Sequence, residues 1–271
     1  MRSKLQRRIQ RYGWDKAVGD YEAGWRTQLE PAQSLMLEMA GLKTGERVLD
    51  VACGTGLVSF RCVDAVGPDG WVVGTDLSGE MVAAAERLAA EKNIHNVAFE
   101  RFHAEEMLLD EAPFDAAICG LGLMYVPNPL KALAEMRRWL KPGGRAAAAV
   151  WGARANCGWA EIFPITDARV VSEVCPMFFQ LGTKDMLANS LTEAGFTDVR
   201  LERLEVELNY ANDDDALGAA FRGGPVALAY NRFDDETKKA VHQEYLASIE
   251  DYRVGDGYAI PGEFVVATGI N

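Results

Sequence analysis

The 271-residue sequence has few residues of the kinds that bind metal ions or form disulfide frameworks. It holds three histidines and five cysteines. The cysteines are odd in number and show no C-x-x-C spacing, which argues against a disulfide framework and a zinc site; they are Cys53, Cys62, Cys119, Cys157 and Cys175. We therefore expect no bound metal and a reducing, cytoplasmic location.

Clustered positive charge and long apolar runs are also scarce. The formal net charge of −12 repels phosphate backbones, so we expect a small-molecule substrate and no nucleic acid. No segment has the length of a membrane span, and the arginine-rich residues 1–16 are not followed by the apolar core of a signal peptide. We expect no stable membrane insertion. The sequence does not decide whether the protein forms an oligomer.

The same basic segment has a few apolar residues. Leu5, Ile9 and Tyr12 would fall on one side of a helix in this segment. Such a basic helix can touch a membrane surface, but a solvated helix packed on the domain is the more ordinary arrangement and is the one we favour.

Residues 47–57, RVLDVACGTGL, predict a buried strand and a tight turn into a helix. Apolar residues surround Asp50, as in a strand buried on both faces. Gly54 and Gly56 then allow a sharp turn and the close approach of a ligand, although many such turns have no further role. A second apolar run ends at Asp76, twenty residues after Gly56, where dinucleotide-type folds place a carboxylate on the ribose hydroxyls of an adenosine.

The glycine loop does not match a pyrophosphate-binding pattern. After Gly54 and Gly56, Ser59 stands where G-x-G-x-x-G requires glycine, and the acid Asp50 precedes the loop. This arrangement disfavours a pyrophosphate and favours an ammonium group. S-adenosyl-L-methionine (SAM) meets both requirements because it has ribose and adenine, no phosphate and a charged amine.

Four segments carry a family resemblance: VLDVACGTG, VGTDLSGEMVAAAE, FDAAICGLGLMYVPNPLKALAEMRRWLKPGGRAAAAVWG and LTEAGFTDV. They resemble the successive motifs of class I SAM-dependent methyltransferases, in particular the methyltransferase type 11 group related to the ubiquinone and menaquinone C-methyltransferases. The resemblance is strong over residues 47–152 and weaker through 196. It implies SAM as cofactor, S-adenosyl-L-homocysteine as product, and a Rossmann-like α/β fold with a mostly parallel seven-stranded sheet, helices on both faces and a helical lid.

Alternating strands and helices support this fold class. We expect strands at 47–52, 71–77, 97–103, 114–120 and 145–151, helices at 78–92, from 129 to a stop at 141–144, and at 183–195, and a closing strand at 263–270. The chain then divides into an N-terminal helical cap (1–46), a SAM-binding core (47–153), a lid insertion (154–182) and a C-terminal part with added helices (183–271).

The resemblance also implies cofactor contacts. Those expected for the methionine part and ribose are the backbone around Ala52, Gly54 and Gly56, the carboxylates of Asp50 and Asp76, and the main chain at Cys119 and Gly120. Those expected for adenine are Leu77, Met81, Ala104 and Glu105, of which Leu77 and Met81 also fit a plain core. Ala52 replaces a glycine of many relatives, so we expect no strongly left-handed backbone there. His103 replaces an acid, which leaves its adenine contact open.

Methyl transfer from a sulfonium needs few catalytic groups. The protein mainly aligns the nucleophile and excludes water, and it supplies a general base only if the nucleophile must lose a proton. The sequence singles out no base; Tyr125 and Tyr21 are the candidates, and the expected walls of the acceptor pocket are Trp25, Tyr125, Trp151 and Trp159. We expect a small, largely apolar or aromatic acceptor. The alternatives are a protein that binds SAM without methyl transfer and, less favoured, a nicotinamide-dependent oxidoreductase.

Overall fold

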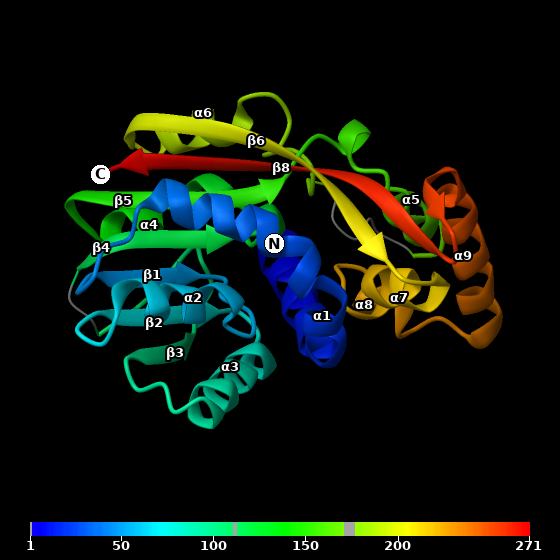
Figure 1. Cartoon of the computed structure of the whole chain (residues 1–271), viewed down its shortest axis with the longest axis horizontal. Helices are drawn as coiled ribbons and strands as arrows, with labels where there is room; N and C mark the ends of the chain where they lie inside the picture. The colour runs from blue at the N-terminus through cyan, green and yellow to red at the C-terminus, as the bar shows by residue number, and fades with distance from the viewer. Residues whose placement is uncertain (1, 111–112, 171–176) are drawn as a thin grey trace.

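A computed structural model describes residues 2–110, 113–170 and 177–271, and Cys175 lies outside the described residues. A mixed sheet forms the centre of the molecule (Figure 1). Its strands are β1 (Arg47–Val51), β2 (Trp71–Asp76), β3 (Val97–Arg101), β4 (Phe114–Gly120), β5 (Leu140–Trp151), β6 (Thr197–Tyr210), β7 (Arg253–Val254) and β8 (Gly257–Ile270). They run in the order β3-β2-β1-β4-β5-β8-β6, and β7 pairs with β8.

The first five strands are parallel, and β8 lies antiparallel between β5 and β6. The expected mostly parallel sheet is therefore confirmed. The closing strand is longer than expected and begins at Gly257, because it pairs with β6 as far as Tyr210. The short strand β7 was not expected.

Helices cover both faces of this sheet. The helices are α1 (Arg2–Ala40), α2 (Leu57–Val66), α3 (Gly79–Glu91), α4 (Pro129–Trp139), α5 (Ile162–Asp167), α6 (Met186–Glu193), α7 (Asp213–Leu217), α8 (Ala227–Tyr230) and α9 (Asp235–Ser248). One face carries α1, α2 and α3, and the other carries α4 and α6 (Figure 1). Shorter turns lie at Leu123–Tyr125, Arg154–Asn156, Gly218–Arg222 and Glu250–Tyr252.

Local signals fix the ends of several helices. The Ser78 hydroxyl accepts a hydrogen bond from the Met81 amide (3.1 Å), and the Asn128 side chain accepts one from Lys131 (3.0 Å), so both residues are N-caps. Helix α4 ends at Trp139, before the glycines that were expected to stop it. Residues 141–144 instead belong to β5, where the Gly143 amide donates to the carbonyl of Asn271 at the end of β8 (2.9 Å).

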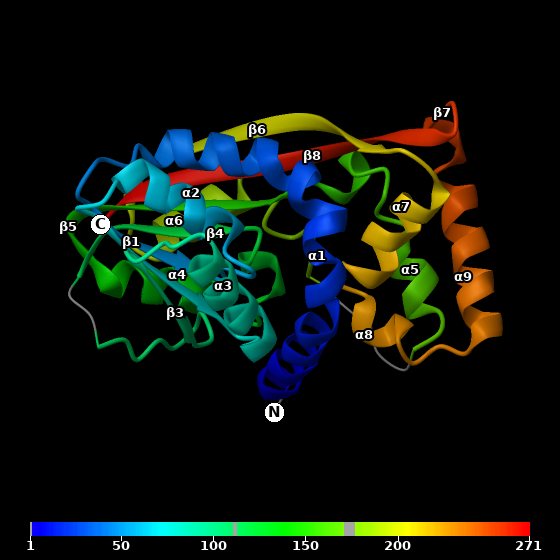
Figure 2. The same ribbon diagram turned by 60° about the horizontal axis from the view of Figure 1, so that its bottom comes forward.

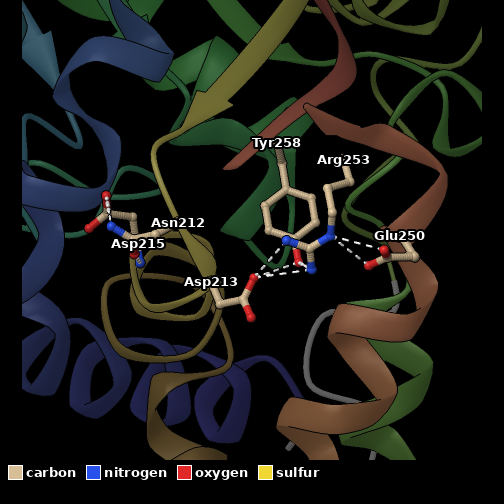
Figure 3. Close-up of polar contacts among 6 residues, drawn as sticks. All are labelled: Asn212, Asp213, Asp215, Glu250, Arg253 and Tyr258. Carbon is tan, nitrogen blue, oxygen red and sulfur yellow. Dashed lines mark hydrogen bonds and ion pairs between the residues drawn. The ribbon is translucent and has the colours of Figure 1, made fainter. Parts of the chain in front are cut away.

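The long strands β6 and β8 extend beyond the rest of the sheet and hold α7 and α9 at their far end (Figures 1 and 2). A polar cluster fastens this end (Figure 3). The Tyr258 hydroxyl donates to Asp213 (2.8 Å), and Arg253 donates to Asp213 (3.2 Å) and Glu250 (2.9 Å). The acidic run at 213–215 forms the first turn of α7, and Asp213 also joins that turn to β7 and β8.

The backbone turns sharply at the carboxyl ends of β1 and β4. Ala52 has φ 58° and Leu121 has φ 64°, both in the left-handed region that non-glycine residues avoid. The expectation for Ala52 was therefore wrong. The turn out of β1 needs this conformation whether or not glycine occupies the position, and the alanine bears a strain on the order of 1–2 kcal/mol.

Gly122 has no room for a side chain because of Ala52. A Cβ atom at position 122 would lie 2.4 Å from the Cβ of Ala52 and 3.0 Å from the Sγ of Cys119. We expect Gly122→Ala to destabilise the fold by about 1–3 kcal/mol through overpacking.

Adding Ala52→Gly removes the closest clash, so the double variant should recover at least about half of that loss in urea unfolding. Additive effects of the two substitutions would show that the two turns do not press on each other.

Candidate functional site

A cavity lies at the carboxyl edge of the parallel strands, beneath the first half of α1. Its polar side is formed by the turns that follow β1, β2 and β3. Its aromatic side is formed by α1, the end of β5 and the segment after β5. The cavity brings together most of the site residues expected from the sequence, namely Tyr21, Trp25, Ala52, Gly54, Asp76, Leu77, Met81, His103, Ala104, Glu105, Gly120, Tyr125, Trp151 and Trp159.

Asp76 joins two turns on the polar side. One carboxylate oxygen accepts from the Gly54 amide (3.0 Å) and the other from the Ser78 amide (2.8 Å). A carboxylate has about four acceptor positions, and the amides of Gly54, Ser78 and Leu77 occupy only part of them, so acceptor capacity is left for a ligand. Asp76 is 9% exposed, and its burial raises its pKa.

The neighbouring surface suits a flat ring. Leu77 and the buried Met81 lie beside Asp76, and Ala104 with Glu105 lies across from them in the turn after β3. The Arg7 guanidinium from α1 lies 3.3 Å from the Glu105 carboxylate and 3.3 Å from Nε2 of His103. Burial and the Arg7 charge lower the pKa of His103, so the imidazole is neutral and its ring faces Arg7.

Three expected residues lie behind the cavity wall. Asp50 is 1% exposed and accepts a hydrogen bond from Ser59 (2.6 Å), while its Oδ1 has no partner among the described residues. Burial raises the pKa of Asp50 to about 7. Gly56, with φ 87°, packs against Phe60. Cys119 is fully buried, and burial raises the pKa of its thiol to about 12, so the thiol stays protonated.

Stacked and edge-on aromatic rings form the other side of the cavity. Ring centroids of Trp151 and Trp159 lie 4.8 Å apart, and Trp25 lies 6.0 Å from each. The ring centroids of Tyr125 and Phe178 lie 5.3 Å apart, and Phe178 lies 5.7 Å from Trp159, so these rings continue the same cluster. The indole N–H of Trp159 is buried and has no hydrogen-bond partner among the described residues.

Some cavity residues gave no signal in the sequence. Arg7 and Gln10 were hidden in a helix that showed only basic character, and Phe178 lies in the segment where the family resemblance is weak. Ser59 was noted only because it breaks a glycine pattern, whereas it holds the Asp50 carboxylate. A helical wheel of residues 7–14 would have placed Arg7, Gln10 and Trp14 on one face.

Tyr21 is a hydrogen-bond donor rather than a base in this environment. Its ring borders Gly54, since a Cβ atom added there would lie 3.8 Å from Tyr21. Burial, with the charge of Asp76, raises the pKa of the Tyr21 phenol far above its ordinary value. The phenol therefore keeps its proton near neutral pH.

Two polar contacts hold α1 over the cavity. Ser78, two residues after Asp76, donates from its hydroxyl to Asp15 of α1 (2.6 Å). Arg7, two turns earlier on α1, pairs with Glu105. The first half of α1 therefore bridges the turns after β2 and β3.

Two other kinds of site are absent from residues 2–110, 113–170 and 177–271. No group of three histidine, cysteine, aspartate or glutamate side chains in these ranges has a geometry that could hold a metal ion. None of the helices formed by the same residues combines the length and hydrophobicity of a membrane span.

The chemistry of the polar side fits SAM. Asp76 has open acceptor positions for ribose hydroxyls, apolar side chains flank a ring-sized surface, and the turns after β1 and β4 expose backbone where a ligand can approach. Residues 52–56, which form the turn after β1, include no cation that could pair with a pyrophosphate, and the carboxylate of Asp76 lies beside this turn.

Comparison with known proteins agrees with this chemistry. A family model described as a methyltransferase domain matches residues 42–170. A demethylmenaquinone methyltransferase of Listeria monocytogenes is 32% identical over 179 residues, which cover 60% of this chain and 75% of that protein.

Solved structures show the same fold. The YcgJ protein from Bacillus subtilis matches with a TM-score of 0.60 and 20% identity, covering 89% of this chain and 98% of that one. Phosphoethanolamine N-methyltransferase 2 of Haemonchus contortus, solved with SAM, matches with a TM-score of 0.60 and 17% identity, covering 94% of this chain and 57% of that one.

These findings confirm the Rossmann-like class I fold and the expected cofactor, and they give no support to a nicotinamide enzyme. The chain belongs to the class I SAM-dependent methyltransferases of the menaquinone and ubiquinone C-methyltransferase type, and it is an enzyme that methylates a small molecule.

Proposed function

We propose that the cavity holds SAM on its polar side and the methyl acceptor against its aromatic side. In this arrangement Asp76 accepts from the ribose hydroxyls, adenine lies between Leu77 and Ala104, and the methionine part follows Ala52 to Gly54. One observation carries the proposal: a single cavity joins the Asp76 carboxylate to the rings of Trp25, Trp151 and Trp159. The helical cap and the insertion at 154–182 then act as its cover.

The bound sulfonium supplies an already activated methyl group. The contribution of this chain is to align the acceptor in line with the sulfur–methyl bond and to exclude water. The aromatic faces suit this task, because they pack against apolar rings and attract a nearby cation.

The aromatic side carries no strong base. Among the described residues that line the cavity, the carboxylates and the imidazole lie on the polar side, at Asp76, Glu105 and His103. Tyr21 is held protonated and Tyr125 is the remaining candidate. This favours an acceptor whose nucleophilic atom is already electron-rich, such as a hydroxylated aromatic ring.

The acceptor class follows from these walls. The Listeria relative is named for methylation of demethylmenaquinone, and we extend to this chain only the class, a small and mostly apolar aromatic compound. The charge of −12 disfavours nucleic acid as substrate. The buried, unpaired thiols of the described cysteines suit a reducing, cytoplasmic location.

Label transfer tests the acceptor class. With methyl-tritiated SAM, we expect label to move into hydroxylated aromatic or quinol compounds, and far less into small aliphatic acids, because the rings of Trp25, Trp151 and Trp159 match flat acceptors. Label that moves instead into transfer RNA, ribosomal RNA or a protein would contradict the proposal. Equal turnover with aliphatic acids would also contradict it.

The ribose contact is tested at Asp76. Asp76→Ala removes two charge-assisted hydrogen bonds, together worth on the order of 2–4 kcal/mol, or about 30- to 1,000-fold in the Kd for S-adenosyl-L-homocysteine. Calorimetry measures this change, and the exposed Asp69→Ala serves as the matched control. A Kd for Asp76→Ala equal to that of the control would show that Asp76 does not contact the cofactor.

Asp50 makes stability and cofactor binding depend on pH. Burial raises the pKa of the Asp50 carboxyl group to about 7. The carboxyl group therefore stays protonated in the folded chain at pH values where it is already ionised in the unfolded chain. Between about pH 4 and pH 8, ionisation therefore costs folding free energy on the order of 2–4 kcal/mol. Over this range the stability of Asp50→Asn relative to the parent should rise by a similar amount in urea unfolding.

The cofactor reverses the preference of Asp50 for its proton. A SAM ammonium near Asp50 favours the ionised carboxylate, so SAM affinity should increase as the pH rises through about 7 in the parent and less in Asp50→Asn. If the SAM affinity of the parent and of Asp50→Asn changed with pH in the same way, ionisation of Asp50 would not contribute to cofactor binding.

A further inference from the structure

The first half of α1 carries an exposed stripe of basic and apolar side chains. Lys4, Arg8 and Lys16 are exposed, and between them Leu5 and Tyr12 are 49% and 48% exposed. At 100° per residue, these five side chains fall within an arc of about 120° on the helix. The stripe is one face of a helical segment about 20 Å long.

The stripe is separate from the cavity. Arg7, Gln10 and Trp14 line the cavity from the same helical turns, and they lie on the opposite side of the helix from Leu5 and Tyr12. Figure 2 shows the amino-terminal turns of α1 projecting past the sheet, with the N-terminus at the lowest point of the view. The exposed side of these turns therefore faces outward at one end of the molecule.

Charge distinguishes this segment from the rest of the chain. Residues 1–16 contain six lysines or arginines and one acid, whereas the whole chain has 28 basic and 40 acidic residues. Arg7 and Arg11 are paired with Glu105 and Asp15. Within the part of the chain that the structure describes, Lys4, Arg8 and Lys16 take part in no ion pair.

We propose that this stripe, formed by Lys4, Leu5, Arg8, Tyr12 and Lys16, docks the enzyme on an anionic lipid surface. The three cations contact lipid headgroups, and Leu5 and Tyr12 enter the boundary between headgroups and acyl chains. The acidic remainder of the chain is repelled by the same surface, so the molecule approaches it with α1 foremost. This face is more suited to lipid than to nucleic acid, because a phosphate polymer gives Leu5 and Tyr12 no apolar partner.

Docking brings the cavity to the lipid. The helix that lies on the surface is also the helix that covers the cavity through Arg7 and Trp14. An apolar molecule dissolved in the bilayer therefore meets the cavity cover without crossing bulk water. The small number of apolar side chains in the stripe makes the docking reversible rather than a permanent insertion.

Sedimentation with vesicles tests this interface on the full chain. We expect binding to vesicles of phosphatidylcholine and phosphatidylglycerol in equal amounts, little binding to phosphatidylcholine alone, and release by added salt. The triple variant K4E/R8E/K16E should bind the anionic vesicles about a hundredfold more weakly or worse. The matched control R87E/R232E/K239E reverses the same number of exposed charges elsewhere and should bind more strongly than the triple variant by at least about tenfold.

The apolar half of the stripe and the fold need separate measurements. Leu5→Ser with Tyr12→Ser should weaken vesicle binding while leaving all charges in place. The affinity of each stripe variant for S-adenosyl-L-homocysteine should match the parent, which shows that the variant is folded. Equal vesicle binding by the triple variant and its control would overturn the proposal. So would binding to a single-stranded RNA homopolymer without binding to anionic vesicles, which would identify the stripe as a nucleic-acid contact.

Discussion

The Asp76 carboxylate is the interaction on which the rest of the site depends. It accepts from Gly54 after β1 and from Ser78 before α3, so one side chain fixes the spacing of two turns that are far apart in the sequence. Ser78 in turn holds Asp15, which places α1 over the cavity. The same carboxylate has acceptor positions left for a ligand. In the proposed site, the adenosine part of the cofactor and the contact that holds α1 over the cavity are therefore at neighbouring residues.

Sequence reasoning predicted the parts of the site that follow from local motifs on parallel strands. The carboxyl ends of such strands meet at one edge of a sheet, so Gly54, Asp76 and Gly120 could be brought together without a structure. Trp151 was predicted because it follows the fifth expected strand, and Trp25 and Trp159 because they lie in the N-terminal segment and the insertion that were expected to close over the site. The fold class followed from the alternation of strands and helices.

Other features depend on contacts between distant segments, which the sequence does not display. The pairing of Arg7 with Glu105 joins α1 to the turn after β3, two segments that are far apart in the sequence. The left-handed conformation of Ala52 is imposed by the turn and contradicts the intrinsic preference of alanine. Asp50 was expected to reach the cofactor ammonium directly or through water, yet Ser59 and the strand packing place it behind the wall, where burial raises its pKa.

The central claim is that one cavity, covered by α1, holds the cofactor. Hydrogen exchange of the backbone amides, with and without saturating S-adenosyl-L-homocysteine, tests it most directly, because local opening of the cover governs exchange. The account predicts slower exchange in the first half of α1, from Arg7 to Trp25, together with the turns around Gly54 and Asp76. Protection confined to those turns, with α1 unchanged, would contradict it.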